Sequence, residues 1–185
     1  MVRVFKRILR GPILPPERIE RYFYYRWLGE ARKEIPAQGP FRIIHEDFGI
    51  ERPILVKAPD YSYYLMLFKD HRLAAIFNAY DGSFEELRYF ERPQRYVTES
   101  KVVRSILSKA LRQYKAEVVE MSTPEIRYDQ ELPGADRFSP RWEVRAVVRD
   151  ARGTVRRVPV SVSAAGRLIS SLDELEETDR QKTKR

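Results

Sequence analysis

The sequence contains no cysteine and only two histidines among its 185 residues. Without cysteine the chain forms no disulfide, has no thiolate nucleophile and offers no sulfur ligand for zinc. No apolar run approaches the roughly 20 residues needed to span a bilayer. The basic start MVRVFKRILRGPILPP has too few consecutive apolar residues for the core of a secretion signal. We therefore expect a cytoplasmic protein with no transmembrane segment.

Recognisable catalytic patterns are also missing. There is no nucleophile elbow, no phosphate-binding glycine loop and no paired-histidine zinc motif. His45 is followed by Glu46 and Asp47, which resembles a metal or acid–base cluster, but on a strand only His45 and Asp47 would share a face. His71 falls in a predicted hairpin turn, where side chains are usually solvated. We expect no enzymatic activity, no cofactor and no metal site.

Basic residues outnumber acidic ones by 35 to 27, which gives a net charge of +8 and an isoelectric point near 9.7. This surplus favours acidic partners such as nucleic acids. We interpret residues 1–15 as a basic arm and 173–185 as a charged tail. The basic residues of the first ten positions are Arg3, Lys6, Arg7 and Arg10. Abundant Arg and Glu without Cys is also a composition found in thermophiles.

Two stretches share a pattern of two strands joined by a short polar turn and closed by a glycine. They are residues 63–87, with Gly82, and residues 141–171, with Gly166. The repetition suggests an internal duplication. We predict an α+β protein made of two tandem helix-plus-antiparallel-sheet units, the first at 16–95 and the second at 96–172, with the boundary near Pro93.

The first unit is predicted to open with a helix over 17–34, whose aromatic residues cover more than one face. The strands expected after it are FRIIHEDF, ILVKA and a hairpin formed by residues 61–69 and 73–80. Both faces of that hairpin are apolar, which indicates a sheet buried on both sides. The stretch 84–95 is charged and aromatic, and Pro93 within it is predicted to mark the linker between the units.

The second unit is predicted to open with an amphipathic helix over 99–115, the most regular periodic stretch in the chain. An extended segment follows at 116–129, and then a hairpin whose first strand alternates apolar and charged residues from Arg141 to Arg149. Pro159 cannot donate a ladder hydrogen bond, so the return strand is expected at a sheet edge or at a bulge.

Two rows of cations are candidates for contact with phosphate groups. The row on the exposed side of the 99–115 helix contains no acid and consists of Lys101, Arg104, Lys109, Arg112 and Lys115. The row on the charged face of the second hairpin consists of Arg141, Arg145, Arg149 and Arg157. A helix covers one face of such a sheet, so the two rows are expected to point away from each other. Simple solvation of these side chains is the alternative.

The order of elements in the second unit resembles the PepSY module, which has a cystatin-like α+β fold. The residues that carry the likeness are the 99–115 helix, the strand WEVRAVV and the close VPVSVSAAGRLIS. Ser163 occupies the position where that family usually has Asp. In the first unit the corresponding segment is FNAYDGSFEEL, and Asn78 occupies the Asp position. The resemblance implies a binding or inhibitory module, and no functional residue is carried over from it.

Two functions are therefore expected as alternatives, with membrane-surface association as a minor third. The first is a basic, non-enzymatic protein that binds RNA or a ribonucleoprotein particle of the ribosomal kind through its Lys and Arg rows. The second is a PepSY-type module that binds a protein or peptide, as a peptidase inhibitor or an assembly factor, through a sheet edge or the apolar face of the first hairpin.

Overall fold

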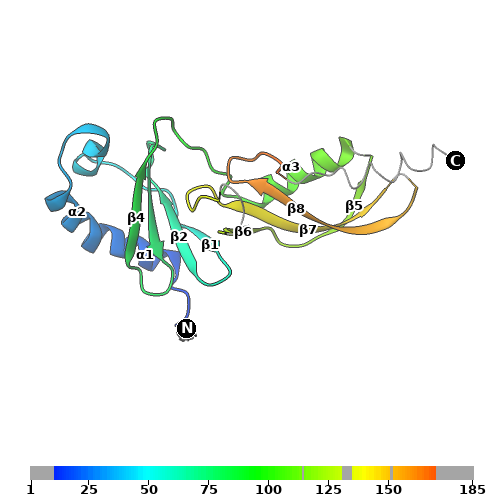
Figure 1. Ribbon diagram of the computed structural model, residues 1–185, viewed down its shortest axis with the longest axis horizontal. Coiled ribbons are helices and arrows are strands. Elements are labelled where there is room, and N and C mark those ends of the chain that lie inside the picture. Colours follow the sequence, from blue (N-terminus) through cyan, green and yellow to red (C-terminus); the bar gives the residue numbers. More distant parts are fainter. Residues whose placement is uncertain (1–10, 114, 131–134, 151, 170–185) are drawn as a thin grey trace, which may run out of the picture. The chain divides into compact units, whose positions relative to one another are not determined.

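The computed structural model describes residues 11–113, 115–130, 135–150 and 152–169 and has an α+β fold (Figure 1). The chain divides into two compact units. Unit 1 comprises residues up to 55 together with 60–92, and unit 2 comprises 56–59 together with the chain from 93 onward. Among the described residues, no helix is long and apolar enough to cross a lipid bilayer.

Unit 1 opens with the predicted helix, which runs from residue 16 to residue 34 in three consecutive segments. They are α1 (Pro16–Tyr22), the π-helical turn η1 (Phe23–Trp27) and α2 (Leu28–Glu34). Pro16 suits the first helical turn, where its missing N–H is not needed. The π turn was not predicted. Its backbone signature is the N–H of Leu28, which donates to the carbonyl of Phe23 five residues earlier.

Two aromatic side chains pack together across the π turn. At 3.6 residues per turn, two side chains four residues apart are offset by about 40° around a helix. Phe23 and Trp27 are four residues apart and so lie on one side of the helix, where they stack with ring centroids 5.1 Å apart and are both buried. Ile19 precedes them in the same row, and all three belong to the core of unit 1.

The next strands along the chain are β1 to β4, of which β2 and β3 form the predicted hairpin and β4 pairs antiparallel with β3. Their bounds are β1 (Ile54–Lys57), β2 (Ser62–Leu67), β3 (Leu73–Asn78) and β4 (Phe84–Tyr89). Every residue of β2 is buried, which confirms the expectation of a sheet covered on both faces. The hairpin turn has His71 at φ 59°, and its N–H donates to the carbonyl of Phe68.

One prediction for unit 1 is wrong, and one strand was not predicted. FRIIH is part of a 3-10 helix, η2 (Gly39–His45), because Gly39 takes a left-handed φ of 62° and Pro40 follows it in the first turn. The strand that was not predicted is β4, which occupies the first six residues of the stretch 84–95. This strand pairs with β3 along one edge, and its charged, half-exposed residues lack the alternation that marks a strand.

Unit 2 places one helix over one face of an antiparallel sheet, as predicted (Figure 1). Its elements are α3 (Ser100–Gln113), β5 (Glu117–Met121), β6 (Glu125–Arg127), β7 (Arg141–Arg149) and β8 (Val155–Ser163). β7 pairs with β5 and β6 on one side and with β8 on the other. The end of β1 joins this sheet in parallel to β6, with Lys57 opposite Arg127.

The alternation predicted for β7 is confirmed by burial. Trp142, Val144, Ala146 and Val148 are buried against Val103, Leu107 and Leu111 of α3, and the residues between them are more exposed. β8 lies at the edge of the sheet, as Pro159 indicated, since β7 is the strand with which it pairs along its length.

Both glycine-ended turns contain a left-handed glycine, and their hydrogen bonds span different numbers of residues. Gly82 and Gly166 have φ of 76° and 82°, values that favour glycine. Asn78 accepts the N–H of Gly82, and Ser163 accepts that of Gly166, through their backbone carbonyls. The side-chain oxygens of the same two residues accept further backbone N–H groups, from Tyr80 and Arg167 respectively.

The Gly82 turn provides a test of the packing of unit 1. A Cβ at Gly82 would lie 2.4 Å from Cδ2 of Tyr22, and an alanine there would have to keep a left-handed φ. We expect Gly82→Ala to lower the free energy of unfolding by about 2–4 kcal/mol. The measurement is urea denaturation followed by tryptophan fluorescence and circular dichroism.

Gly29 is the matched control, because it lies in α2 and a Cβ there would meet nothing within 4 Å. Gly29→Ala is expected to raise the free energy of unfolding by about 0.5–1 kcal/mol, since alanine favours helix more than glycine does. A Gly82→Ala variant as stable as the parent chain would contradict the close packing of Tyr22 on this turn.

Candidate functional site

The helix α3 carries the first predicted basic row on the side opposite its buried residues. All five cations are exposed: Lys101, Arg104, Lys109, Arg112 and Lys115. Lys101 Nζ lies 2.6 Å from a carboxylate oxygen of Glu99, and this hydrogen bond raises the pKa of Lys101. The other four cations make no ion pair with any residue that the structure describes. Ser105 and Ser108 lie among them, and the face contains no acid.

Lys115, the last residue of this row, has a left-handed backbone conformation, with φ at 53°. Its N–H donates to Arg112, and the N–H of Ala116 donates to Leu111, over 3.0 and 3.1 Å. This pair of bonds is the Schellman arrangement at a helix end, where glycine is usual because a side chain costs conformational energy. Lys115 and Arg112 also line a hollow beside the start of β5.

The second predicted row, on the open face of the sheet, is largely neutralised by glutamates. Arg141 Nη2 lies 2.8 Å from Glu143 Oε1, and Arg149 Nη1 lies 3.1 Å from Glu117 Oε2. Glu117 is the direct cross-strand neighbour of Arg149. Two of the four arginines expected to face a polyanion are therefore held by carboxylates of the same sheet.

A larger charge network lies where β6 and the end of β1 meet on this face. Glu125 accepts from Lys57 over 2.7 Å and from Arg127 over 2.9 Å. Hydrogen bonds from Lys57 and then Arg127 lower the pKa of Glu125, so this carboxylate stays negative at neutral pH. Arg127 also lies 3.5 Å from Glu143. The open face therefore contains alternating charges in place of a continuous positive row.

Arg145 and Arg157 are the remaining members of the sheet row. Both are exposed, and neither forms an ion pair within the described ranges. The register pairs Arg145 with Pro159 and Val147 with Arg157, so the two arginines lie on the same face of β7 and β8. The rows on α3 and on this face lie on opposite sides of the sheet, as expected. Arg3, Lys6, Arg7 and Arg10 of the basic arm lie outside the described residues.

A third basic row, which was not predicted, lies on the exposed side of α1 and η1. It consists of Arg18, Arg21 and Arg26 with Tyr25 between them, and Tyr25 is 89% exposed. Arg18, Arg21 and Tyr25 are three and four residues apart, as on one side of a regular helix, and Arg26 follows directly. The sequence itself therefore contains a signal for this row. The many aromatic residues of this stretch indicate core packing first, and they obscure the spacing of the arginines between them.

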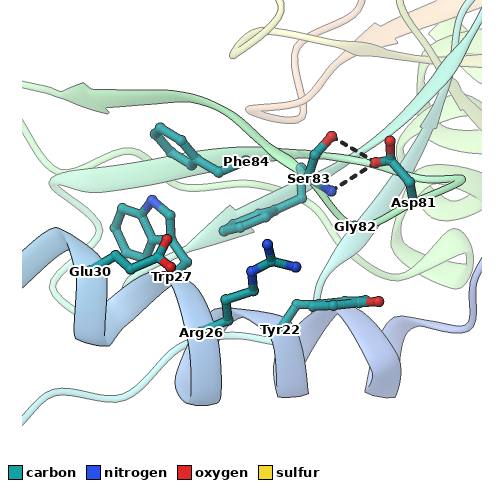
Figure 2. A pocket seen from close by; sticks show the side chains of 9 residues that line it. Tyr22, Arg26, Trp27, Glu30, Asp81, Gly82, Ser83 and Phe84 are labelled. Carbon is teal, nitrogen blue, oxygen red and sulfur yellow. Dashed lines mark hydrogen bonds between the residues drawn. The ribbon is translucent and has the colours of Figure 1, made fainter.

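A hollow of about 360 Å³ adjoins this row where the helix faces the Gly82 turn (Figure 2). Tyr22 and Arg26 enter it from the helix, and the turn from Asp81 to Ser83 closes the opposite side. Asp81 accepts from both the N–H and the hydroxyl of Ser83. The hydroxyl bond is the largest cause of the lowered pKa of Asp81, which therefore stays ionised.

The aromatic wall of the same hollow is formed by Trp27, Phe77 and Phe84. Phe84 lies 5.1 Å from Trp27 and 5.8 Å from Phe77 between ring centroids. Trp27 is only 9% exposed, and its indole N–H has no hydrogen-bond acceptor among the described residues. In Figure 2 the indole nitrogen lies at the edge of the ring nearest Phe84.

The two histidines serve local structure. His45 lies at the end of η2, with Nε2 2.7 Å from the carbonyl oxygen of Ile35. His71 Nε2 lies 3.3 Å from Glu51 Oε1 at the first hairpin. The described residues contain no group of three or more His, Asp or Glu side chains suited to a metal ion.

The conformation of Lys115 makes a prediction about stability. Lys115→Gly is expected to raise the free energy of unfolding by about 0.5–1 kcal/mol, because glycine takes a positive φ at no steric cost. Gln113→Gly, at the last residue of α3, should lower it by a similar amount. Urea denaturation measures both, and equal losses of stability in the two variants would contradict the left-handed helix end.

Comparison with models of protein families, with curated proteins and with solved structures finds no match to this chain. A function is therefore proposed from the chemistry of the chain's own side chains.

Proposed function

We propose that this chain is a non-enzymatic, cytoplasmic RNA-binding protein built from two tandem PepSY-like units. Its contact with RNA, alone or within a ribonucleoprotein particle, is made by the exposed face of α3 through phosphate groups. One observation carries the proposal: Arg104, Lys109, Arg112 and Lys115 are exposed together, and the described residues provide no carboxylate partner for any of them.

The geometry of the row suits a charged backbone. At 1.5 Å of rise per residue, Arg104 and Arg112 are about 12 Å apart along the helix axis. Lys115 follows just past the helix end, so that four cations can contact several successive phosphates. Such contacts read no sequence, and their strength comes from the release of counterions. Ser105 and Ser108 add hydroxyl donors between the cations.

The arrangement of charge favours α3 over the open face of the sheet. An arginine that already binds a carboxylate must give up that ion pair before it binds phosphate. Arg141 and Arg149 are in this position, and their partners Glu143 and Glu117 would repel an approaching polyanion. The cations of α3, apart from Lys101, have no such competitor among the described residues.

The left-handed Lys115 also supports a binding role for this face. Glycine would stabilise the helix end, yet the position holds a long cationic side chain at the end of the basic row. Residues kept in unfavourable backbone conformations are often those that serve a function. The cost to stability is consistent with a charge that binding requires.

Binding of a protein or peptide is a second candidate, and the edge of β8 is the observation that favours it. From Val155 to Val160 this strand pairs with β7 on one side, and no other described strand covers its opposite side. Extended peptides add to such edges in several families of binding modules. A peptidase inhibitor or an assembly factor would use this surface.

The first proposal is tested by reversing charge on α3. In Arg104→Glu/Arg112→Glu, the affinity for a structured RNA at about 100 mM salt should fall at least tenfold. The slope of log affinity against log salt should become shallower by about 2, one unit for each phosphate that the variant no longer neutralises. Filter binding over a range of salt concentrations measures both quantities.

The matched control is Lys33→Glu/Arg72→Glu, which makes the same change in net charge at exposed positions of unit 1. It should keep the salt slope of the parent chain. Equal reductions of affinity in the two double variants would mean that net charge alone governs binding, and an unchanged affinity in the α3 variant would rule out this face as the RNA contact.

A further inference from the structure

The row on α1 and η1 combines cations with an exposed aromatic ring. Arg18, Arg21 and Arg26 are exposed, and in the described part of the chain none of them has a carboxylate partner. Glu17, the acid next to Arg18, lies 3.3 Å from Arg52 instead. Tyr25 projects between these arginines with 89% of its surface exposed. An exposed ring beside several cations is the pattern that binds unpaired bases.

Tyr25 lies on the outer side of the π turn. Phe23 and Trp27 are buried at its two ends, and the residues between them are exposed. Tyr24, by contrast, keeps an edge contact with Phe23 at 5.1 Å between ring centroids and is 43% exposed. π turns are rare and occur often at functional sites. Among the aromatic residues of η1, Tyr25 thus contributes least to the packing of unit 1.

The row and the hollow of Figure 2 are continuous, because Tyr22 and Arg26 line both the surface around Tyr25 and the hollow. Inside the hollow, the indole N–H of Trp27 has no acceptor, and the carboxylate of Glu30 has no donor, among the described residues. A donor and an acceptor of this kind can contact the edge of a nucleobase. The volume of about 360 Å³ lies within the range of small-molecule sites.

We infer that unit 1 has a site for single-stranded nucleic acid on α1 and η1. Arg18, Arg21 and Arg26 bind phosphates, one base stacks on Tyr25, and a neighbouring base enters the hollow beside Trp27. A duplex does not fit this site, because its bases are already stacked on one another and cannot stack on a tyrosine. This inference goes beyond the proposed function, which concerns α3 in unit 2.

The first test uses Trp27 as a reporter. The chain has two tryptophans, and Trp142 is buried in unit 2 with its N–H donating to the carbonyl of Val97. Titration with a 12-nucleotide oligouridylate is expected to change the tryptophan fluorescence to a saturating value. The host chain is Arg104→Glu/Arg112→Glu, so that α3 contributes little. Trp27→Phe in this host should abolish the fluorescence change, and its persistence would overturn the inference.

The second test separates stacking from charge. Tyr25→Ala should weaken binding of the fluorescein-labelled oligouridylate about 5- to 100-fold, the usual range for removal of one stacked base. Tyr25→Phe keeps the ring and should bind within about twofold of its host, as should the control Tyr24→Ala. Fluorescence anisotropy measures these affinities. Equal affinity of Tyr25→Ala and its host would overturn the inference.

Inorganic polyphosphate of matched charge completes the design, since it offers phosphates without bases. It should displace the labelled oligouridylate much less well than unlabelled oligouridylate does, and equal displacement would overturn the inference. The two proposals can fail separately. Weaker binding of structured RNA in the α3 variant supports the proposed function whatever Tyr25→Ala does, and weaker binding of oligouridylate in Tyr25→Ala supports the site in unit 1 whatever the α3 variant does.

Discussion

The stacking of Phe23 on Trp27 is the contact on which the arrangement of unit 1 depends. The two rings are four residues apart and stack across the π turn η1. Trp27 then packs against Phe84 of β4, beyond the Gly82 turn on which Tyr22 rests. One aromatic contact therefore links the helix register, the turn between β3 and β4, and the hollow between them.

In unit 2 the position of the glutamates decides which cations are available. β5, β6 and β7 bring Glu117, Glu125 and Glu143 beside the arginines of the open face, whereas on the outer face of α3 only Lys101 has a carboxylate partner among the described residues, Glu99. Net charge gives no hint of this difference, because both surfaces are rich in basic residues. Pairing between strands makes one surface a network of ion pairs and leaves the other positive.

Strong periodicity made much of the fold predictable from sequence. The amphipathic pattern of α3, the alternation in β7 and the apolar hairpin of β2 and β3 all correspond to elements of the structure. β4 and η2 were missed, because β4 is charged at a sheet edge and FRIIH has the composition of a strand while Gly39 and Pro40 direct it into a tight helix. The candidate α3 face was predictable from helical spacing alone. The pairing of Arg149 with Glu117 was not, because it requires the register between strands 32 residues apart.

Pro159 affects how copies of this chain can meet. Ser161 accepts the N–H of Ile169, and Ser163 donates to Arg167, so alternate residues of β8 turn their backbone groups outward. Pro159 belongs to the same alternate set of residues as Ser161 and Ser163, so its nitrogen also points away from β7. The ladder of hydrogen bonds with β7 therefore continues through Pro159. The free edge thus lacks a donor at its centre, and residues 167–169 occupy its end. A second β8 could not extend this sheet into a continuous ladder, which protects a basic, valine-rich edge strand from open-ended self-association.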